Sequence, residues 1–213
     1  MDSRLLLVAV IGLLALIGSF WPAALLPAPR RLGTPSAMDR STFANRFLLW
    51  CAEGLGTGRI PVAPGTMGSV VGVGWTVALL GLPSAWTWGL TVVAGAAVSV
   101  WLCGHAEGLL ARSDPPSVVA DEIFAMPLVF AGWMLRLNAA HGGWTTPGLW
   151  SSGSTWVCLA LGFAAFRFFD VAKPWPVRQS QSLVGGWGVT IDDFLAAAYA
   201  NLIWIPVSLL GWW

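Results

Sequence analysis

Long apolar stretches, separated by short segments rich in Gly, Pro and polar residues, dominate the hydrophobic pattern of the chain. A helix needs about 20 mainly apolar residues to cross a bilayer, and six stretches approach that length. They predict an all-α, polytopic membrane protein with a bundle of about five to six apolar helices. Neither the alternation of a membrane β-barrel nor an internal repeat is seen. The stretches are Leu5–Leu26, Met67–Leu82, Trp86–Cys103, Val118–Leu137, Thr155–Phe169 and Phe194–Trp213.

Two of these stretches have alternative interpretations. Leu5–Leu26 follows a charged start and contains Ala23 and Ala24, so it also fits a secretory signal peptide. Met67–Leu82 is short and rich in Gly, which suits either close helix packing or a re-entrant hairpin, and it is the weakest of the predicted spans.

The segment Leu32–Arg46 is polar and contains Pro and Ser, so it predicts a linker or a surface helix. We therefore expect a boundary near residue 40. Residues 1–40 would form an extra N-terminal membrane helix with its linker, and residues 41–213 the main membrane domain.

Composition narrows the class of protein. Of 213 residues, 56% are hydrophobic and only 10% are charged, and the mean hydropathy of +0.71 nearly excludes a water-soluble globule. Fifteen Trp against one Tyr fit a chain that meets the membrane interface. The net charge of +1 offers no basic surface, so no nucleic-acid partner is expected. The three widely spaced cysteines are expected to be small packing residues.

Positive charge predicts the orientation, because Lys and Arg accumulate in the cytoplasmic loops of membrane proteins. With the N-terminus outside, only Arg4 and Arg136 fall on the outer side. The motif-bearing loops then face the cytoplasm. The residues on that side are Arg30, Arg31, Arg40, Arg46, Arg59, Arg112, Arg167, Lys173 and Arg178.

Six of the ten acidic residues lie at the edges of apolar stretches on this inner side. An ionised carboxylate at membrane depth costs several kcal/mol unless it is paired or binds a cation. Ion pairs explain any single one of them, but the nearby positive charges are too few for all. A hard divalent cation such as Mg²⁺, which takes oxygen ligands, would balance the excess. The six are Glu107, Asp121, Glu122, Asp170, Asp192 and Asp193, and the last five are the candidate metal ligands.

A Gly-rich segment, Gly54–Ser69, leads into an apolar helix and is a candidate phosphate site. The unpaired N–H groups of a helix start can bind phosphate, with Thr66 or Ser69 as a hydroxyl donor. The segment lacks the Lys of a P-loop, and a tight turn is the alternative interpretation.

Basic and acidic side chains are also close together between Phe166 and Pro176. Arg167 and Asp170 are i,i+3 neighbours and share a helix face, whereas Pro174 forces Lys173 out of that helix. Lys173 is the only lysine of the chain. It is suited to neutralise a phosphate, and an ion pair with Asp170 explains it equally well.

The segment Gly185–Asp193 ends in two carboxylates, which we expect at the start of the last helix. Acidic side chains there also complement the helix dipole. Adjacent helical side chains point about 100° apart, so Asp192 and Asp193 are expected to have different roles, one ligating metal and one orienting water.

Three sequence blocks are highly specific in their joint order and spacing. They are GLGTGRIPVAPGTMGS at Gly54–Ser69, DPPSVVADE at Asp114–Glu122, and FRFFDVAKPWP with GGWGVTIDD at Phe166–Pro176 and Gly185–Asp193. Between about residues 45 and 205 the chain thereby resembles the phosphatidylglycerophosphatase A family of bacterial membrane lipid phosphatases. Leu5–Leu26 lies outside the resemblance and is interpreted as an added anchor.

The resemblance implies Mg²⁺-dependent hydrolysis of phosphatidylglycerol phosphate to phosphatidylglycerol and inorganic phosphate, in phospholipid biosynthesis. It also implies a multi-pass protein of the bacterial inner membrane, with its active site facing the cytoplasm and a membrane phospholipid as substrate. The expected catalytic residues are Asp121, Glu122, Asp170, Lys173, Asp192 and Asp193, with Mg²⁺ held by some of the five carboxylates and phosphate bound by Thr66, Ser69, Arg167 and Lys173.

Some alternatives stay open. Water is the expected nucleophile, with a covalent aspartyl-phosphate as the alternative. A small ion-coupled transporter would place its charges near the bilayer midplane, and a non-catalytic lipid-binding protein would pair them structurally. His105 and His141 are expected to have structural roles.

Overall fold

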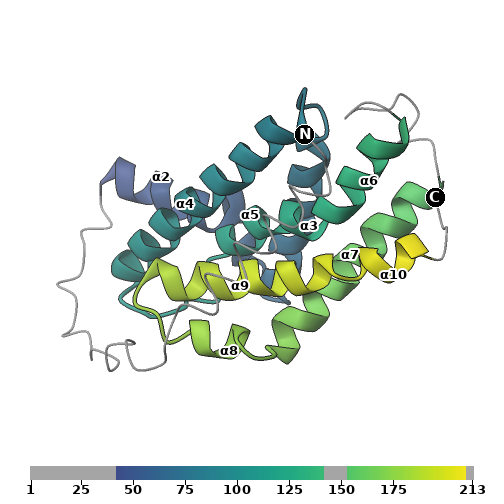
Figure 1. Ribbon diagram of the computed structural model, residues 1–213. Coiled ribbons are helices and arrows are strands. Elements are labelled where there is room, and N and C mark those ends of the chain that lie inside the picture. The colour runs from purple at the N-terminus through teal and green to yellow at the C-terminus, as the bar shows by residue number, and fades with distance from the viewer. Residues whose placement is uncertain (1–41, 142–152, 210–213) are drawn as a thin grey trace.

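The computed structural model describes residues 42–141 and 153–209, and this part of the chain is all-α, as predicted (Figure 1). The predicted helix Leu5–Leu26 lies outside the described residues, so the division near residue 40 stays a prediction. The elements are α2 (Phe43–Ala52), the 3₁₀ helix η2 (Gly54–Arg59), α3 (Pro64–Leu79), α4 (Ala85–Leu110), α5 (Ala120–Val129), α6 (Ala131–His141), α7 (Gly153–Ala172), α8 (Val177–Ser180), α9 (Gly186–Asn201) and α10 (Trp204–Leu209).

Local sequence signals explain several helix ends. Ser84 and Thr87 form a capping box at the start of α4, each side chain accepting a hydrogen bond from the other's backbone N–H at 3.2 Å. Pro64 occupies the first position of α3, where its missing N–H costs no hydrogen bond. α7 ends at Ala172, two residues before Pro174.

The short helix α5 is central to the packing and contacts α3, α4, α7 and α9 (Figure 1). Ala125, Met126 and Val129 of this helix are fully buried. A helix that is apolar on all sides must be surrounded by other helices, and Phe130 and Phe166 extend the same core. α5 therefore fixes the positions of its neighbours, and its first turn carries two of the predicted site residues.

Glycines let neighbouring helices approach this core closely. A Cβ at Gly72 of α3 would lie 2.7 Å from the Cβ of Met126 on α5. A Cβ at Gly162 of α7 would overlap the ring of Phe130, and one at Gly186 of α9 would overlap the backbone of α4 at Val100. Such small residues at helix contacts are typical of helices packed within a membrane.

The stretch Val118–Leu137, predicted as one span, is instead two helices that meet at Phe130. Pro127 lies inside α5 and has no N–H to donate, and Phe130 leaves helical geometry with φ −96° and ψ 3°. The last stretch also differs from the prediction, because α9 begins at Gly186, before the apolar run, and ends at Asn201. A search for apolar stretches does not detect the first turns of α9, because these turns contain polar residues. They belong to the helix because α9 packs against α4.

Two helices of the described residues are long and apolar enough to cross a membrane: α4 with 26 residues and α7 with 20. Trp86, Leu90 and Val93 of α4 are more than half exposed, as apolar side chains facing lipid would be. α3 is one continuous helix of 16 residues, about 24 Å long and shorter than the roughly 30 Å hydrocarbon core. About five to six spans were predicted, and the described residues contain two candidates.

We expect Gly186→Ala to destabilise the protein, because the added methyl group would push α9 away from the backbone of α4. Overpacking of this kind costs about 1–3 kcal/mol. The matched control is Gly89→Ala on α4, where a Cβ meets nothing within 4 Å. Thermal unfolding in detergent should give a lower Tm for Gly186→Ala and none of that loss for Gly89→Ala; equal Tm values for both would contradict the close α4–α9 contact.

Candidate active site

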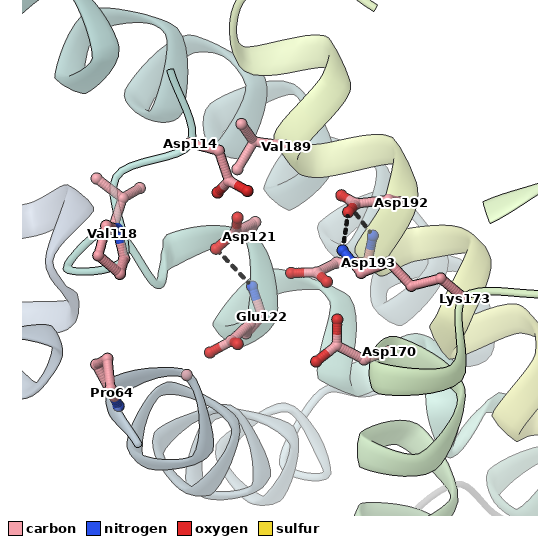
Figure 2. A pocket seen from close by; sticks show the side chains of 12 residues that line it. Pro64, Asp114, Val118, Asp121, Glu122, Asp170, Lys173, Val189, Asp192 and Asp193 are labelled. Atoms are coloured by element: carbon pink, nitrogen blue, oxygen red, sulfur yellow. Dashed lines mark hydrogen bonds and ion pairs between the residues drawn. The ribbon is translucent and has the colours of Figure 1, made fainter. Parts of the chain in front are cut away.

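A pocket of about 220 Å³ lies where α3 and α5 begin, where α7 ends and beside the second turn of α9 (Figure 2). All five predicted metal ligands line it, together with Lys173. The sequence therefore identified residues that three separate segments bring to one place. The lining residues are Pro64, Gly65, Asp114, Pro116, Val118, Asp121, Glu122, Asp170, Lys173, Val189, Asp192 and Asp193.

The first turn of α5 supplies Asp121 and Glu122. Its entry is fixed by the backbone N–H of Val119, which donates to the carbonyl of Ala52 at 3.0 Å. Asp121 is buried, and its Oδ1 accepts from the backbone N–H of Glu122 at 3.0 Å. Glu122 lies against Gly65 of α3, where a Cβ would overlap its carboxylate. The glycine therefore makes room for an acidic side chain between two helices.

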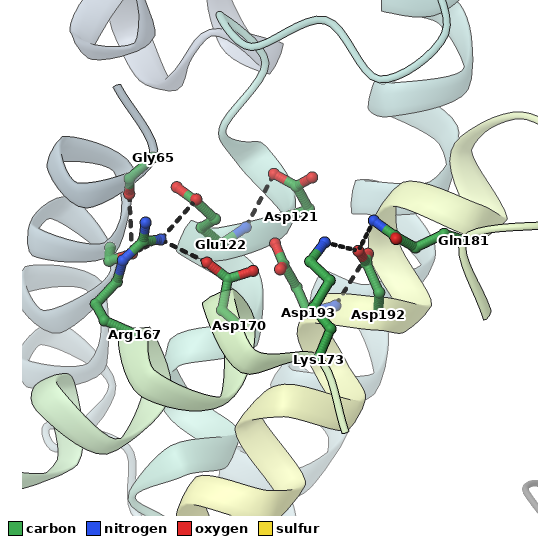
Figure 3. A network of polar contacts seen from close by, with 10 residues as sticks. Gly65, Asp121, Glu122, Arg167, Asp170, Lys173, Gln181, Asp192 and Asp193 are labelled. Atoms are coloured by element: carbon green, nitrogen blue, oxygen red, sulfur yellow. Dashed lines mark hydrogen bonds and ion pairs between the residues drawn. The ribbon is translucent and has the colours of Figure 1, made fainter. Parts of the chain in front are cut away.

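Arg167 of α7 links three elements around the pocket (Figure 3). It forms ion pairs with Asp170 at 2.8 Å and with Glu122 at 3.0 Å, so the predicted i,i+3 pair is confirmed. It also donates to Ser69 Oγ at 3.4 Å, and Ser69 in turn donates to the carbonyl of Gly65 at 2.9 Å. One guanidinium thus joins α3, α5 and α7.

Lys173 follows the last residue of α7, as the position of Pro174 predicted, and has a left-handed backbone with φ 43°. Its Nζ contacts Asp192 Oδ2 at 2.7 Å, so its ion-pair partner is Asp192 and not Asp170. Gln181 donates to the same oxygen at 3.0 Å. Burial alone would lower the pKa of Lys173, but its hydrogen bond and ion pair with Asp192 raise it above the ordinary value.

Asp192 and Asp193 are both buried, and both line the pocket. The prediction that they begin the last helix is wrong, because α9 starts six residues earlier at Gly186, so they do not complement its dipole. Burial raises the pKa of Asp192 to about 6 although the charge of Lys173 opposes the shift. Burial and the nearby Asp121 raise the pKa of Asp193 well above its usual range.

The predicted phosphate site at the start of α3 is only partly in contact with the pocket. Pro64 and Gly65 line it, whereas Thr66 and Ser69 are not among the lining residues. Ser69 contributes through Arg167 instead. The preceding Gly-rich segment forms the tight turn η2, with Gly54 and Gly56 at positive φ.

The sequence did not single out Asp114 and Gln181 as site residues. Asp114 lines the pocket on a left-handed backbone with φ 46°, and its N–H donates to Glu107 Oε1 at 2.8 Å. Its position in the DPPS segment, seven residues before Asp121, was the available signal. Glu107 lies outside the pocket and supports this loop, and nothing in the pattern marks Gln181.

The carboxylates surround the pocket without forming a closed cage. Among the described residues, no group of three or more His, Cys, Asp or Glu side chains is arranged to hold a metal ion. Glu122 Oε2 is buried and has no hydrogen-bond partner in this part of the chain. The cysteines Cys51, Cys103 and Cys158 are free thiols away from the pocket, and His105 contacts the carbonyl of Trp101 on α4. The side chain of His141 lies outside what the structure describes.

Comparison with known proteins gives a consistent result. The family model of phosphatidylglycerophosphatase A matches residues 50–208. The phosphatidylglycerophosphatase A of Escherichia coli is 33% identical over 162 residues, 75% of this chain and 82% of the relative. The protein of the same name from Haemophilus influenzae is 33% identical over 153 residues, 71% of this chain and 83% of the relative.

A third relative, from Bacteroides thetaiotaomicron, is provisionally named a phosphatidylinositol-3-phosphatase and is 31% identical over 154 residues, 70% of this chain and 86% of the relative. No solved structure matches the chain. By the family model and by these relatives, the chain belongs to the phosphatidylglycerophosphatase A family of lipid phosphatases.

Proposed function

We propose that the protein hydrolyses the terminal phosphate of phosphatidylglycerol phosphate, with Mg²⁺ as cofactor, to give phosphatidylglycerol and inorganic phosphate. Family membership implies the phosphatidylglycerol phosphate phosphatase activity. The observation that carries the proposal is the gathering of six carboxylates with Lys173 in one pocket, with Arg167 beside it. The place of the activity in phospholipid biosynthesis, and a multi-pass topology with the pocket facing the cytoplasm, are parts of the same proposal.

The two cations are suited to hold a phosphate. Phosphoryl transfer depends mainly on positioning and on neutralising negative charge. Arg167 lies near the end of α7 and Lys173 directly after it, and each has a carboxylate partner within 3.0 Å. Both side chains are about one quarter exposed, so a phosphate entering the pocket can reach them.

The donor set fits Mg²⁺. Asp170 and Asp192 are paired with Arg167 and Lys173, and in the described part of the chain no ion pair with a cation involves Asp121 or Asp193. Asp121, Asp193 and the unpartnered oxygen of Glu122 would hold the ion. Proteins commonly bind Mg²⁺ through one or two carboxylates plus waters and substrate phosphates, so a closed cage is not required. When bound, the ion supplies polarisation of the phosphoryl oxygens and activation of water.

Asp114, Asp121 and Asp193 line the pocket and have no ion pair with a cation in the described part of the chain. One of these carboxylates can accept the proton of the attacking water while the others help to hold the ion. A covalent aspartyl-phosphate is the alternative route.

The ion-coupled transporter is less well supported. A carrier would place its charges midway along its spanning helices. Here Asp121, Glu122 and Asp170 lie at the start of α5 and near the end of α7, and Asp192 and Asp193 lie on α9, which is not one of the candidate spans among the described residues. A pocket at the end of the candidate span α7 suits a charged lipid headgroup whose acyl chains stay in the bilayer.

The first experiment measures inorganic phosphate release from phosphatidylglycerol phosphate in mixed micelles. Release by the parent protein should require Mg²⁺ and stop with a chelator, and Asp121→Asn should lower it by about 100-fold or more. Glu53→Gln is the control, because Glu53 pairs with Arg59 outside the pocket, and it should stay close to the parent. No release by well-folded parent protein under any divalent cation would overturn the proposal.

A second experiment isolates the lysine. Lys173→Met should lower kcat/KM by about 10²–10³-fold, the usual loss when one group that stabilises transition-state charge is removed. Arg178→Met removes an exposed positive charge from α8, outside the pocket, and should behave as the parent. Equal activity of both variants would exclude Lys173 from phosphate binding.

A further inference from the structure

An apolar groove lies on the opposite side of α5 from the polar pocket. It has a volume of about 750 Å³, within the usual range of small-molecule sites, and is bounded by α3, α4, α5 and the residues around η2. Val71 and Trp75 form the α3 wall, Val98 and Leu102 the α4 wall, and Ile123 and Phe124 of α5 lie between them. The lining is almost wholly apolar, so its natural occupant is hydrocarbon.

One position of the α3 wall, Gly74, has no side chain and leaves part of the groove open. A Cβ at Gly74 would meet nothing within 4 Å, whereas a Cβ at Gly68 or Gly72 of the same helix would collide with α5. Gly74 is therefore not required for close helix packing. It leaves space in a wall where Trp75 and Phe124 stand edge to face, with ring centroids 6.3 Å apart.

One helical turn connects this groove to the polar pocket. Asp121 and Glu122 point into the pocket, while the neighbouring Ala120, Ile123 and Phe124 face the groove. Figure 2 places Asp121 and Glu122 on this first turn of α5, facing the pocket. The start of α5 thus separates a charged site from an apolar one.

The other apolar cavities lie farther from the pocket. One of about 220 Å³ surrounds Trp86 and Gly89, at the end of α4 away from Glu107, and another of about 210 Å³ lies at the start of α7. The groove at Gly74 is larger than either, and it alone among these three is formed by residues of the first turn of α5.

We propose that this groove binds an acyl chain of the lipid whose phosphorylated headgroup occupies the polar pocket. The inference rests on the proposed function. It adds a binding site for the acyl chain, the part of the lipid on which selectivity for chain length depends. A phosphoglycerol headgroup separates the terminal phosphate from the acyl chains, so the chains must lie outside the charged pocket, against an apolar surface. The groove next to the same turn of α5 is such a surface, and annular lipid or residues 1–41 are the competing occupants.

The test fills the groove without disturbing the packing. Gly74→Leu places a branched apolar side chain in the open space, and Gly89→Leu makes the same change at another open glycine, in the remote cavity of α4. Each variant and the parent are assayed with long-chain phosphatidylglycerol phosphate in mixed micelles and with a water-soluble short-chain analogue. Thermal unfolding of all three proteins is measured in parallel.

We expect Gly74→Leu to raise KM for the long-chain substrate about tenfold. The leucine side chain would displace one or two methylene groups of the acyl chain from the groove, and the loss of their burial weakens binding by about this factor. Turnover of the short-chain analogue should be unchanged, and Gly89→Leu should match the parent on both substrates. Parent protein that hydrolyses neither substrate would count against the proposed function itself.

Three results would overturn the groove assignment while leaving the proposed function intact. Gly74→Leu could match the parent on both substrates, which would mean that only annular lipid fills the space. The variant could lose activity on both substrates equally. It could also have a lower Tm than the parent. Either of these results would mean that protein, such as residues 1–41, occupies the groove.

Discussion

Six carboxylates share one pocket with a single lysine, and this excess of negative charge among apolar helices is the constraint on which the rest of the site depends. Charges removed from water are stable only when they are paired or bound to a cation. Arg167 and Lys173 pair with Glu122, Asp170 and Asp192. Glu122 Oε2 still has no hydrogen-bond partner, and Asp114, Asp121 and Asp193 have no ion pair among the described residues. The proposed divalent ion would balance part of this negative charge, and it would also offset the charge of the bound phosphate.

The fold keeps these charges close together. α5 is short and buried on most sides, and its first turn reaches the pocket because Val119 is hydrogen-bonded to Ala52. Gly65 leaves room for the Glu122 carboxylate, and Gly186 lets α9 lie against α4. Helix packing and the site therefore share a residue. Gly65 lets α3 lie close to α5 and leaves the space that the Glu122 carboxylate occupies.

The sequence predicts the site better than it predicts the helices. Because a buried carboxylate is costly, Asp121, Glu122, Asp170, Asp192 and Asp193 could be selected from charge in an apolar chain, and all five line the pocket.

The ends of the helices were harder to predict, since hydrophobicity did not detect the break at Phe130 or the polar first turns of α9. The partner of Lys173 depends on how α7 and α9 pack, which sequence spacing does not contain, so spacing suggested Asp170 where the structure has Asp192. Asp114 was missed although it begins the DPPSVVADE block, and Gln181 was missed because nothing in its local pattern separates it from ordinary loop residues.

The most direct test of the charge balance is a binding measurement on the resting protein. Thermal unfolding of the purified protein in detergent should be followed with and without Mg²⁺, for the parent and for Glu122→Gln. A ligand that binds only the folded state raises Tm, so Mg²⁺ should raise the Tm of the parent and do so less for Glu122→Gln. If Mg²⁺ leaves the Tm of the parent unchanged at concentrations that support phosphate release, this result would contradict the claim that the excess of carboxylates binds the metal.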